Sequence, residues 1–150
     1  MNEEIERSST AELILAFMQF HKLNWQRSAV DDHNPSEMRL LISIFEVNRH
    51  RGKDVKAAEL SRILHISPSS VTQLLNKLEK DGLLMRQMSE RDRRSMLVSL
   101  TDEGIKAADQ GRQRIAAVFE ELVGYLGEKD SRQLTELMNK VFAFFNQRKL

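Results

Sequence analysis

The sequence has 150 residues, of which 41% are hydrophobic and 30% are charged, and its formal net charge is +1. This size and composition predict a single unit with a buried core. The absence of cysteine excludes disulfides, thiol redox sensing and thiolate metal sites. No apolar run reaches the ~18 residues of a membrane span, and the acidic start differs from a signal peptide. We therefore expect a cytoplasmic protein with no membrane partner.

Two helices are predicted near the start of the chain, over residues 8–26 and 35–48, from their apolar periodicity. Asn34 and Pro35 favour the start of the second helix, because asparagine caps a helix and proline suits its first position. Residues 49–54 are expected to form the next connection, either as a solvated loop or as an edge near phosphates. The predicted buried face of the second helix consists of Met38, Leu41, Ile42 and Phe45.

A short helix over residues 57–64 and a second helix from Pro68 are predicted next, joined by a tight link. Ser67 is a favourable N-cap before the proline, and Gly82 supplies the left-handed residue that ends the second helix. The positions expected to be buried are Leu60, Ile63 and Leu64 in the first helix and Val71, Leu74, Leu75 and Leu78 in the second. The opposite face of the second helix carries hydrogen-bonding groups and cations but no carboxylate.

The periodicity then changes to that of strands, over residues 84–88 and 95–100, with a loop over 89–94 that contains three arginines. Two helices joined by a tight turn and followed by a hairpin form a winged helix-turn-helix. Such a module places one helix in the major groove of DNA and the hairpin tip on the backbone or in the minor groove. Residues 49–94 hold 11 Lys and Arg against 6 Asp and Glu, a net charge of +5, while the rest of the chain carries −4. This distribution of charge favours contact with a phosphate backbone.

Two long helices are predicted at the end of the chain, over residues 102–126 and 130–148, with Thr101 as the N-cap of the first and Gly127 at its end. The first half of the 102–126 helix is polar, and we expect it to be an exposed shaft. The last helix is apolar over more than half of its circumference, which would expose a large apolar patch in a monomer. We expect the first and last helices to pair with those of a second copy; packing within one chain is the alternative.

The segments ELSRILHISPSSVTQLLNKLEKDGLL and ERDRRSMLVSLTDEG resemble the MarR family of bacterial transcriptional regulators, and the resemblance covers most of the chain. It implies a mostly α fold with a small β-hairpin wing. In this fold residues 35–100 form the winged helix-turn-helix, and residues 1–30 and 102–150 form a helical dimerisation region. The resemblance also implies a homodimer that is often released from DNA by a small ligand or an oxidant. Because cysteine is missing, the chain departs from the peroxide-sensing branch of the family.

We predict that the exposed face of the helix from Pro68 reads bases in the major groove, where amides pair with adenine and hydroxyls pair with several bases. The predicted base-reading residues are chiefly Ser69, Ser70, Thr72, Gln73 and Asn76, and Ser67, the N-cap of the same helix, is predicted to belong to the DNA-binding surface. The ammonium groups of Lys77 and Lys80 are predicted to contact phosphates, because a flexible cation positions a protein on DNA rather than specifying a base.

The family resemblance places the wing on Arg91, Asp92, Arg93 and Arg94. It implies that Arg91 or Arg93 meets the minor groove and that Asp92 pairs with Arg94. Arg86, in the first strand of the hairpin, either supports the hairpin base by a salt bridge or is an ordinary strand-edge arginine.

The predicted function is sequence-specific binding of double-stranded DNA by a homodimer that regulates transcription, as a repressor, from a pseudo-palindromic operator. The sequence leaves open a winged-helix regulator without an effector and a winged helix used for protein interaction. No glycine-rich phosphate loop or nucleophile motif occurs, so neither an enzyme nor a cofactor is expected. No metal site is expected either, because the four histidines lack the spacing with carboxylates that a metal cage needs.

A small aromatic or amphipathic effector is the further partner that the resemblance suggests. Its pocket would lie where the dimer helices meet the DNA-binding module. The residues that would line this pocket are Phe17, His21, Trp25, Met38, Ile42 and Phe45. Each of these side chains fits a plain core position better than a ligand site.

Overall fold

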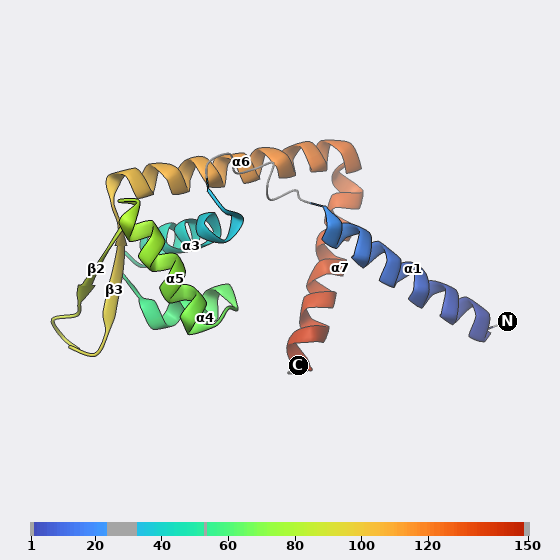
Figure 1. Cartoon of the computed structure of the whole chain (residues 1–150). Coiled ribbons are helices and arrows are strands. Elements are labelled where there is room, and N and C mark those ends of the chain that lie inside the picture. The colour runs from blue at the N-terminus through green and yellow to red at the C-terminus, as the bar shows by residue number, and fades with distance from the viewer. Residues whose placement is uncertain (1, 24–32, 53, 149–150) are drawn as a thin grey trace.

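The computed structural model describes residues 2–23, 33–52 and 54–148 of the chain. Its elements are α1 (Asn2–Lys22), α3 (Pro35–Arg51), β1 (Val55–Lys56), α4 (Ala57–Leu64), α5 (Pro68–Lys80), β2 (Leu84–Met88), β3 (Met96–Leu100), α6 (Asp102–Leu126) and α7 (Glu128–Gln147). Figure 1 shows α3, α4, α5 and the strands gathered at one end of the long helix α6, with α7 and α1 at its other end. The predicted fold class, mostly α with a small β-hairpin wing, is confirmed.

The three strands form one antiparallel sheet in the order β1-β3-β2. Val98 in β3 pairs with Val55 on one side and with Arg86 on the other. The predicted hairpin is confirmed with one change: β3 begins at Met96, so its loop runs over residues 89–95 instead of 89–94. Strand β1 was not predictable from the pattern of residues, because two residues are too few to show an alternation.

The core of the module lies between α3, α4, α5, the sheet and the first half of α6. Its buried residues are Leu40, Leu41, Ile44, Val55, Leu60, Leu64, Val71, Leu75, Leu78, Leu83, Leu84, Val98, Leu100 and Ala108. The predicted apolar face of α5 is confirmed, and Leu74 packs at its edge. The prediction that Ile63 is buried is wrong, because its side chain is 39% exposed. In a helix of two turns, Leu60 and Leu64 share the inward face, and Ile63 lies to one side of it.

One face of the first half of α6 is buried against the module, which contradicts the predicted exposed shaft. Gly104, Ala108 and Gly111 are the buried residues of this helix, and they face the module. A Cβ added at Gly104 would lie 1.8 Å from the carbonyl oxygen of Leu83. Small residues give no hydrophobic signal in a sequence pattern, yet they let the helix backbone approach its neighbour closely. This close packing fixes α6 on the module.

Helix α3 is longer than predicted, because it continues through Arg49 and His50 to Arg51. The prediction that these residues belong to a connection over 49–54 is therefore wrong. Cations stabilise the C-terminal end of a helix by interacting with its dipole. In addition, His50 Nε2 lies 3.3 Å from an oxygen of Glu46, one turn earlier. Gly52, with φ of 63°, then ends the helix.

The first and last helices also begin earlier than predicted, α1 at Asn2 and α7 at Glu128. The predicted end of the first helix at residue 26 lies outside the described residues. For α7, Glu128 and Asp130 suit the first turn because acidic side chains are stabilised at a helix N-terminus. Gly127, with φ of 81°, separates α6 from α7, as predicted.

Helices α1 and α7 and the second half of α6 expose most of their apolar side chains. Those more than a third exposed include Leu13, Ile14, Phe17, Met18 and Phe20 of α1, Phe119, Leu122, Val123 and Tyr125 of α6, and Leu134, Leu137, Met138, Phe142, Phe144 and Phe145 of α7. An apolar groove between α1 and α7 is lined by Phe17, Val141 and Phe144. In the described part of the chain, no helix is long and apolar enough to span a membrane.

Candidate nucleic-acid interface

Hydroxyl groups stabilise the first turn of α5. Ser67 is the N-cap, and its Oγ accepts the backbone N–H of Ser70 at 3.1 Å. The same Oγ lies 3.0 Å from the hydroxyl of Ser69 and 2.8 Å from that of Ser70. The hydroxyl of Thr72 donates to the carbonyl oxygen of Pro68 at 3.0 Å. The predicted N-cap is therefore confirmed, and the hydroxyls of Ser67 and Thr72 each make a hydrogen bond within α5.

The middle of α5 presents polar side chains along a shallow groove. Gln73, Asn76, Lys77 and Lys80 line this groove together with Asp81, which follows the helix. All five residues are exposed. They are three or four residues apart, so successive turns of the helix place them on one face. The structure thus brings four of the predicted DNA-contacting residues together on a single exposed surface.

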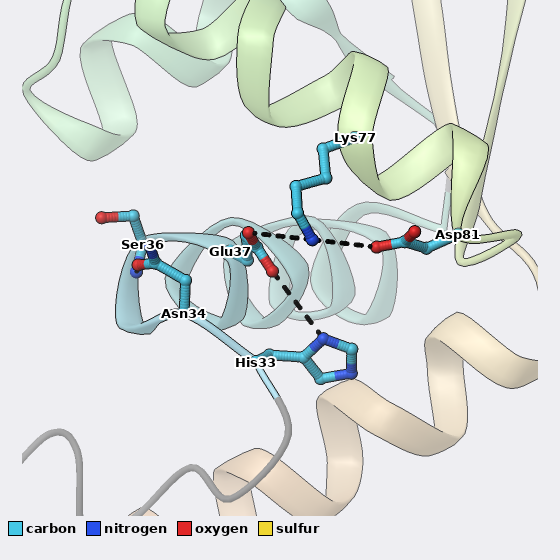
Figure 2. A network of polar contacts seen from close by, with 6 residues as sticks. All are labelled: His33, Asn34, Ser36, Glu37, Lys77 and Asp81. Carbon is cyan, nitrogen blue, oxygen red and sulfur yellow. Dashed lines mark hydrogen bonds and ion pairs between the residues drawn. The ribbon is translucent and has the colours of Figure 1, made fainter.

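The ammonium group of Lys77 lies between two carboxylates (Figure 2). Its Nζ is 3.3 Å from Oε1 of Glu37, near the start of α3, and 3.2 Å from Oδ2 of Asp81. Glu37 is only 5% exposed, and its other oxygen lies 3.8 Å from Nδ1 of His33. Hydrogen bonds to Asp81 and Glu37 raise the pKa of Lys77 above its ordinary value. Lys77 therefore ties α5 to α3.

This contact bears on the predicted phosphate contacts. A phosphate at Lys77 must compete with the carboxylates of Glu37 and Asp81. Lys80 lines the same groove, and among the described residues its ammonium has no ion-pair partner. The pairing of Glu37 with α5 was not predictable from the sequence. The position of Glu37 in the first turn of a helix suggested only a favourable interaction with the helix dipole, and a pairing between residues 40 positions apart leaves no local pattern.

Arg86 of β2 joins the wing to α5 through two side chains. Its Nε donates to Oε2 of Glu79 at 3.1 Å, and its Nη2 donates both to the same oxygen and to Oδ1 of Asn76, the latter at 2.8 Å. The hydrogen bond from Arg86 is the main cause that lowers the pKa of Glu79 below its ordinary value. Of the two alternatives for Arg86, the salt bridge at the hairpin base is therefore correct.

Asp92 organises the tip of the wing. Its Oδ1 accepts the backbone N–H of Arg94 at 3.1 Å, and its Oδ2 accepts the hydroxyl of Ser95 at 2.6 Å. The expected pairing of Asp92 with Arg94 thus takes another form, through the backbone of Arg94 and not its guanidinium. Arg91, Arg93 and Arg94 are all exposed. The carboxylate of Asp92 therefore accepts hydrogen bonds from within the loop, and the three arginines remain exposed.

Replacement of Asp92 by alanine is expected to loosen the wing tip without unfolding the module. The hydrogen bond from Ser95, and then that from the Arg94 backbone, lower the pKa of Asp92. Because the folded-state pKa is lowered, this stabilisation is present at neutral pH and is lost as the pH falls through the lowered value. Amide hydrogen exchange at Arg94, followed by NMR, should be faster in Asp92→Ala than in the wild type at neutral pH. Equal exchange rates at Arg94 would contradict this role.

The residues proposed to line an effector pocket are not gathered in one place. Met38 is buried and packs against the partly buried Ile42 and Ile115, whereas Phe45 packs against the main core. Phe17 lines the groove between α1 and α7, His21 is exposed, and Trp25 lies outside the described residues. Within one chain these residues do not line one cavity, and the pocket expected where the dimer helices meet the DNA-binding module stays a prediction. The apolar positions were correctly found, but the periodicity of one helix does not show which neighbour it packs against.

Comparison with known proteins agrees with this geometry. A family described as "Winged helix DNA-binding domain" matches residues 34–104. The uncharacterized HTH-type transcriptional regulator YkoM of Bacillus subtilis is 30% identical over 110 residues, which are 72% of this chain and 68% of YkoM. Wild-type MarR from E. coli in its apo form is 25% identical, with a TM-score of 0.65 over 87% of this chain and 94% of MarR.

A further solved structure, Streptococcus pneumoniae FabT in complex with DNA, shares the fold over almost the whole chain. Its TM-score is 0.68 over 97% of this chain and 95% of FabT, at 21% identity. The relatives named here are regulators of transcription and not enzymes. From the winged helix, the matching regulator sequences and the shared architecture, this chain belongs to the MarR family of winged helix-turn-helix transcriptional regulators.

Proposed function

We propose that two copies of the chain associate through α1, α7 and the second half of α6, and that the dimer represses transcription from an inverted repeat in double-stranded DNA. In this arrangement each α5 enters a major groove, and each wing lies along the backbone or in the adjacent minor groove. FabT, which shares this fold, has been solved in complex with DNA, and this supports the same mode of binding here.

The main observation that supports a dimer is the exposed apolar surface of α1, α7 and the second half of α6, at the end of the molecule far from α5 (Figure 1). Phe142 is 64% exposed and Tyr125 is 87% exposed, and no residue of α7 is buried within the described chain. A surface of this kind is unfavourable in water and marks an interaction site. A two-fold symmetric dimer would cover it and would present two α5 helices about one turn of DNA apart, ~34 Å.

The exposed face of α5 supplies the groups for sequence recognition in this proposal. Gln73 and Asn76 carry amides, which hydrogen bond with base edges, and Ser69, Ser70 and Thr72 carry hydroxyls. Ser67 acts mainly through its cap on the first turn. Lys77 and Lys80 on α5, and the exposed arginines of the wing, face the phosphates in this arrangement. Of Arg91 and Arg93, one enters the minor groove.

Two substitutions on α5 are expected to separate base recognition from phosphate contact. Gln73→Ala should flatten the preference among DNA sequences, because an amide that distinguishes bases is lost. Lys80→Ala should weaken all sequences alike and reduce the slope of log K against log salt by roughly 0.9. Fluorescence anisotropy titrations of labelled duplexes at several salt concentrations measure both effects. Identical behaviour of the two variants would contradict the assignment.

We also propose that the protein acts in the cytoplasm. The remaining part of the proposal is release from DNA by a small aromatic or amphipathic ligand. A ligand weakens DNA binding only if it binds the DNA-free arrangement more tightly, and by that difference alone. In a dimer the second subunit brings further apolar walls to the groove beside Phe17. A thermal-shift screen with aromatic acids tests this part. If no acid both stabilises the protein and weakens DNA binding, an effector-independent regulator is the better account.

A further inference from the structure

We infer that Arg86 fixes the side-chain amide of Asn76 with its NH2 group turned away from Arg86 and toward DNA, and that Asn76 therefore selects guanine over adenine at its base pair. This inference rests on the proposed function, because it assigns a base preference to one side chain of the α5 surface. It differs from the usual expectation for asparagine, whose amide pairs with adenine through both of its atoms.

The orientation of the Asn76 amide follows from the chemistry of its partner. Nη2 of Arg86 lies 2.8 Å from Oδ1 of Asn76. A guanidinium has five N–H donors and no acceptor, so the atom of the amide that faces it must be the oxygen. The NH2 group of Asn76 consequently points away from Arg86. Asn76 is exposed on the α5 face, so its NH2 group can donate hydrogen bonds to DNA.

Arg86 is itself held in place by a second contact. Nε of Arg86 donates to Oε2 of Glu79 at 3.1 Å, and Nη2 donates to the same oxygen. The side chain of Arg86 is only 23% exposed, compared with 39% for Glu79. A planar guanidinium bound at two of its nitrogens cannot turn away without breaking both contacts. Arg86 is therefore a positioning residue, which acts on DNA through Asn76.

An amide held in this orientation distinguishes the two purines. In the major groove guanine presents two acceptors, N7 and O6, whereas adenine presents the N7 acceptor beside the N6 amino donor. The NH2 group of Asn76 can donate to either acceptor of guanine, but beside adenine it meets the N6 amino group, which also donates. Pairing with adenine in the usual way would require Oδ1 to accept a second hydrogen bond, from the N6 amino group, while the amide plane is held by the bond from Arg86. Bonds to charged groups are among the stronger ones in proteins.

Gln73 provides an internal comparison on the same helix. It lies three residues before Asn76 and is exposed, and no hydrogen bond to its amide is found among the described residues. Its amide remains able to turn and to use both of its atoms. We therefore expect α5 to read two purines differently, adenine through Gln73 and guanine through Asn76.

The test is selection of bound duplexes from a random pool with the full-length wild type and with Asn76→Ala, Gln73→Ala and Arg86→Lys. In the wild type, the position that loses its preference in Asn76→Ala should favour guanine over adenine by about tenfold. The position that depends on Gln73 should favour adenine. Arg86→Lys keeps the charge near Glu79 but lacks the planar fork, so the Asn76-dependent position should accept adenine as well as guanine.

Asn76→Asp is the sharpest variant, because it keeps an oxygen for Arg86 and replaces the donors by a second oxygen. Its preference at the same position should move toward cytosine, whose N4 amino group donates to carboxylates. Asn76 is exposed, so the alanine and aspartate variants decide the question even if Arg86→Lys fails to fold.

Two results would overturn the inference while leaving the proposed function intact. One is a strong preference for adenine at the position that Asn76→Ala flattens. The other is a set of selected sequences that does not change in Asn76→Ala or Asn76→Asp. If the wild type enriches no sequence at all, both the proposed function and this inference fail.

Discussion

Phe142→Glu is expected to leave each subunit folded, to separate the dimer, and to weaken binding to the selected DNA by about 100-fold or more. Phe142 is 64% exposed in the single chain, so its replacement removes little from the core of the subunit. In a dimer, the same position would place an unpaired carboxylate against apolar side chains, which is strongly unfavourable. Once the subunits separate, the second half-site no longer binds as part of the same molecule, and avidity is lost.

The matched control is Gln133→Glu, which adds the same charge to the same helix. Gln133 is exposed and lies nine residues before Phe142, which places it on the opposite side of α7 at ~100° per residue. Sedimentation equilibrium should give twice the 17.4 kDa chain mass for the wild type and for Gln133→Glu, and a single chain mass for Phe142→Glu. A dimer in all three proteins would show that α7 does not form the interface.

Gly104→Ala is expected to destabilise the protein by about 2–3 kcal/mol, through overpacking at the first turn of α6. The added methyl group would lie 1.8 Å from the carbonyl oxygen of Leu83. That oxygen accepts the backbone N–H of Thr101 at 3.1 Å, and Leu83 is itself buried. The obstacle is therefore backbone that is held on two sides, and α6 must move away from the module to relieve the clash.

Gly124→Ala is the control in the same helix. Within one subunit, no atom outside the adjoining turns of α6 lies within 4 Å of a Cβ placed at Gly124, and alanine in a helix interior is favoured over glycine by about 0.5–1 kcal/mol. Urea unfolding at one fixed protein concentration should therefore move the two midpoints in opposite directions, because unfolding of a dimer depends on concentration. Equal midpoints for Gly104→Ala and Gly124→Ala would contradict the tight packing of α6 against Leu83.

Features that depend on residues close together in the sequence were predictable from it. Ser67 and Pro68 mark the start of α5 because each satisfies a need of the first turn, and Gly82 takes the left-handed conformation after it. The alternation in residues 96–100 identifies β3 because one side of the strand faces the core. These signals together define the winged helix-turn-helix and most of its polar face.

Features that depend on contacts between distant segments were not predictable in the same way. Gly104 and Gly111 look like interruptions in a helix pattern, yet at both positions α6 approaches the module too closely for a Cβ atom. The partnership of Glu37 with Lys77, and that of Arg86 with Asn76, depend on the tertiary fold. For this reason the sequence predicted the polar face of α5, but it did not show that Asn76 and Lys77 are already hydrogen-bonded.

The most direct test of the account is alignment of the duplexes that the wild-type protein selects from a random pool. If a two-fold dimer presents two α5 helices to one side of DNA, the aligned sequences should form an inverted repeat with half-sites about 10 base pairs apart, centre to centre. A single unrepeated motif, or no enrichment in low salt, would contradict the proposed arrangement of the two subunits on DNA.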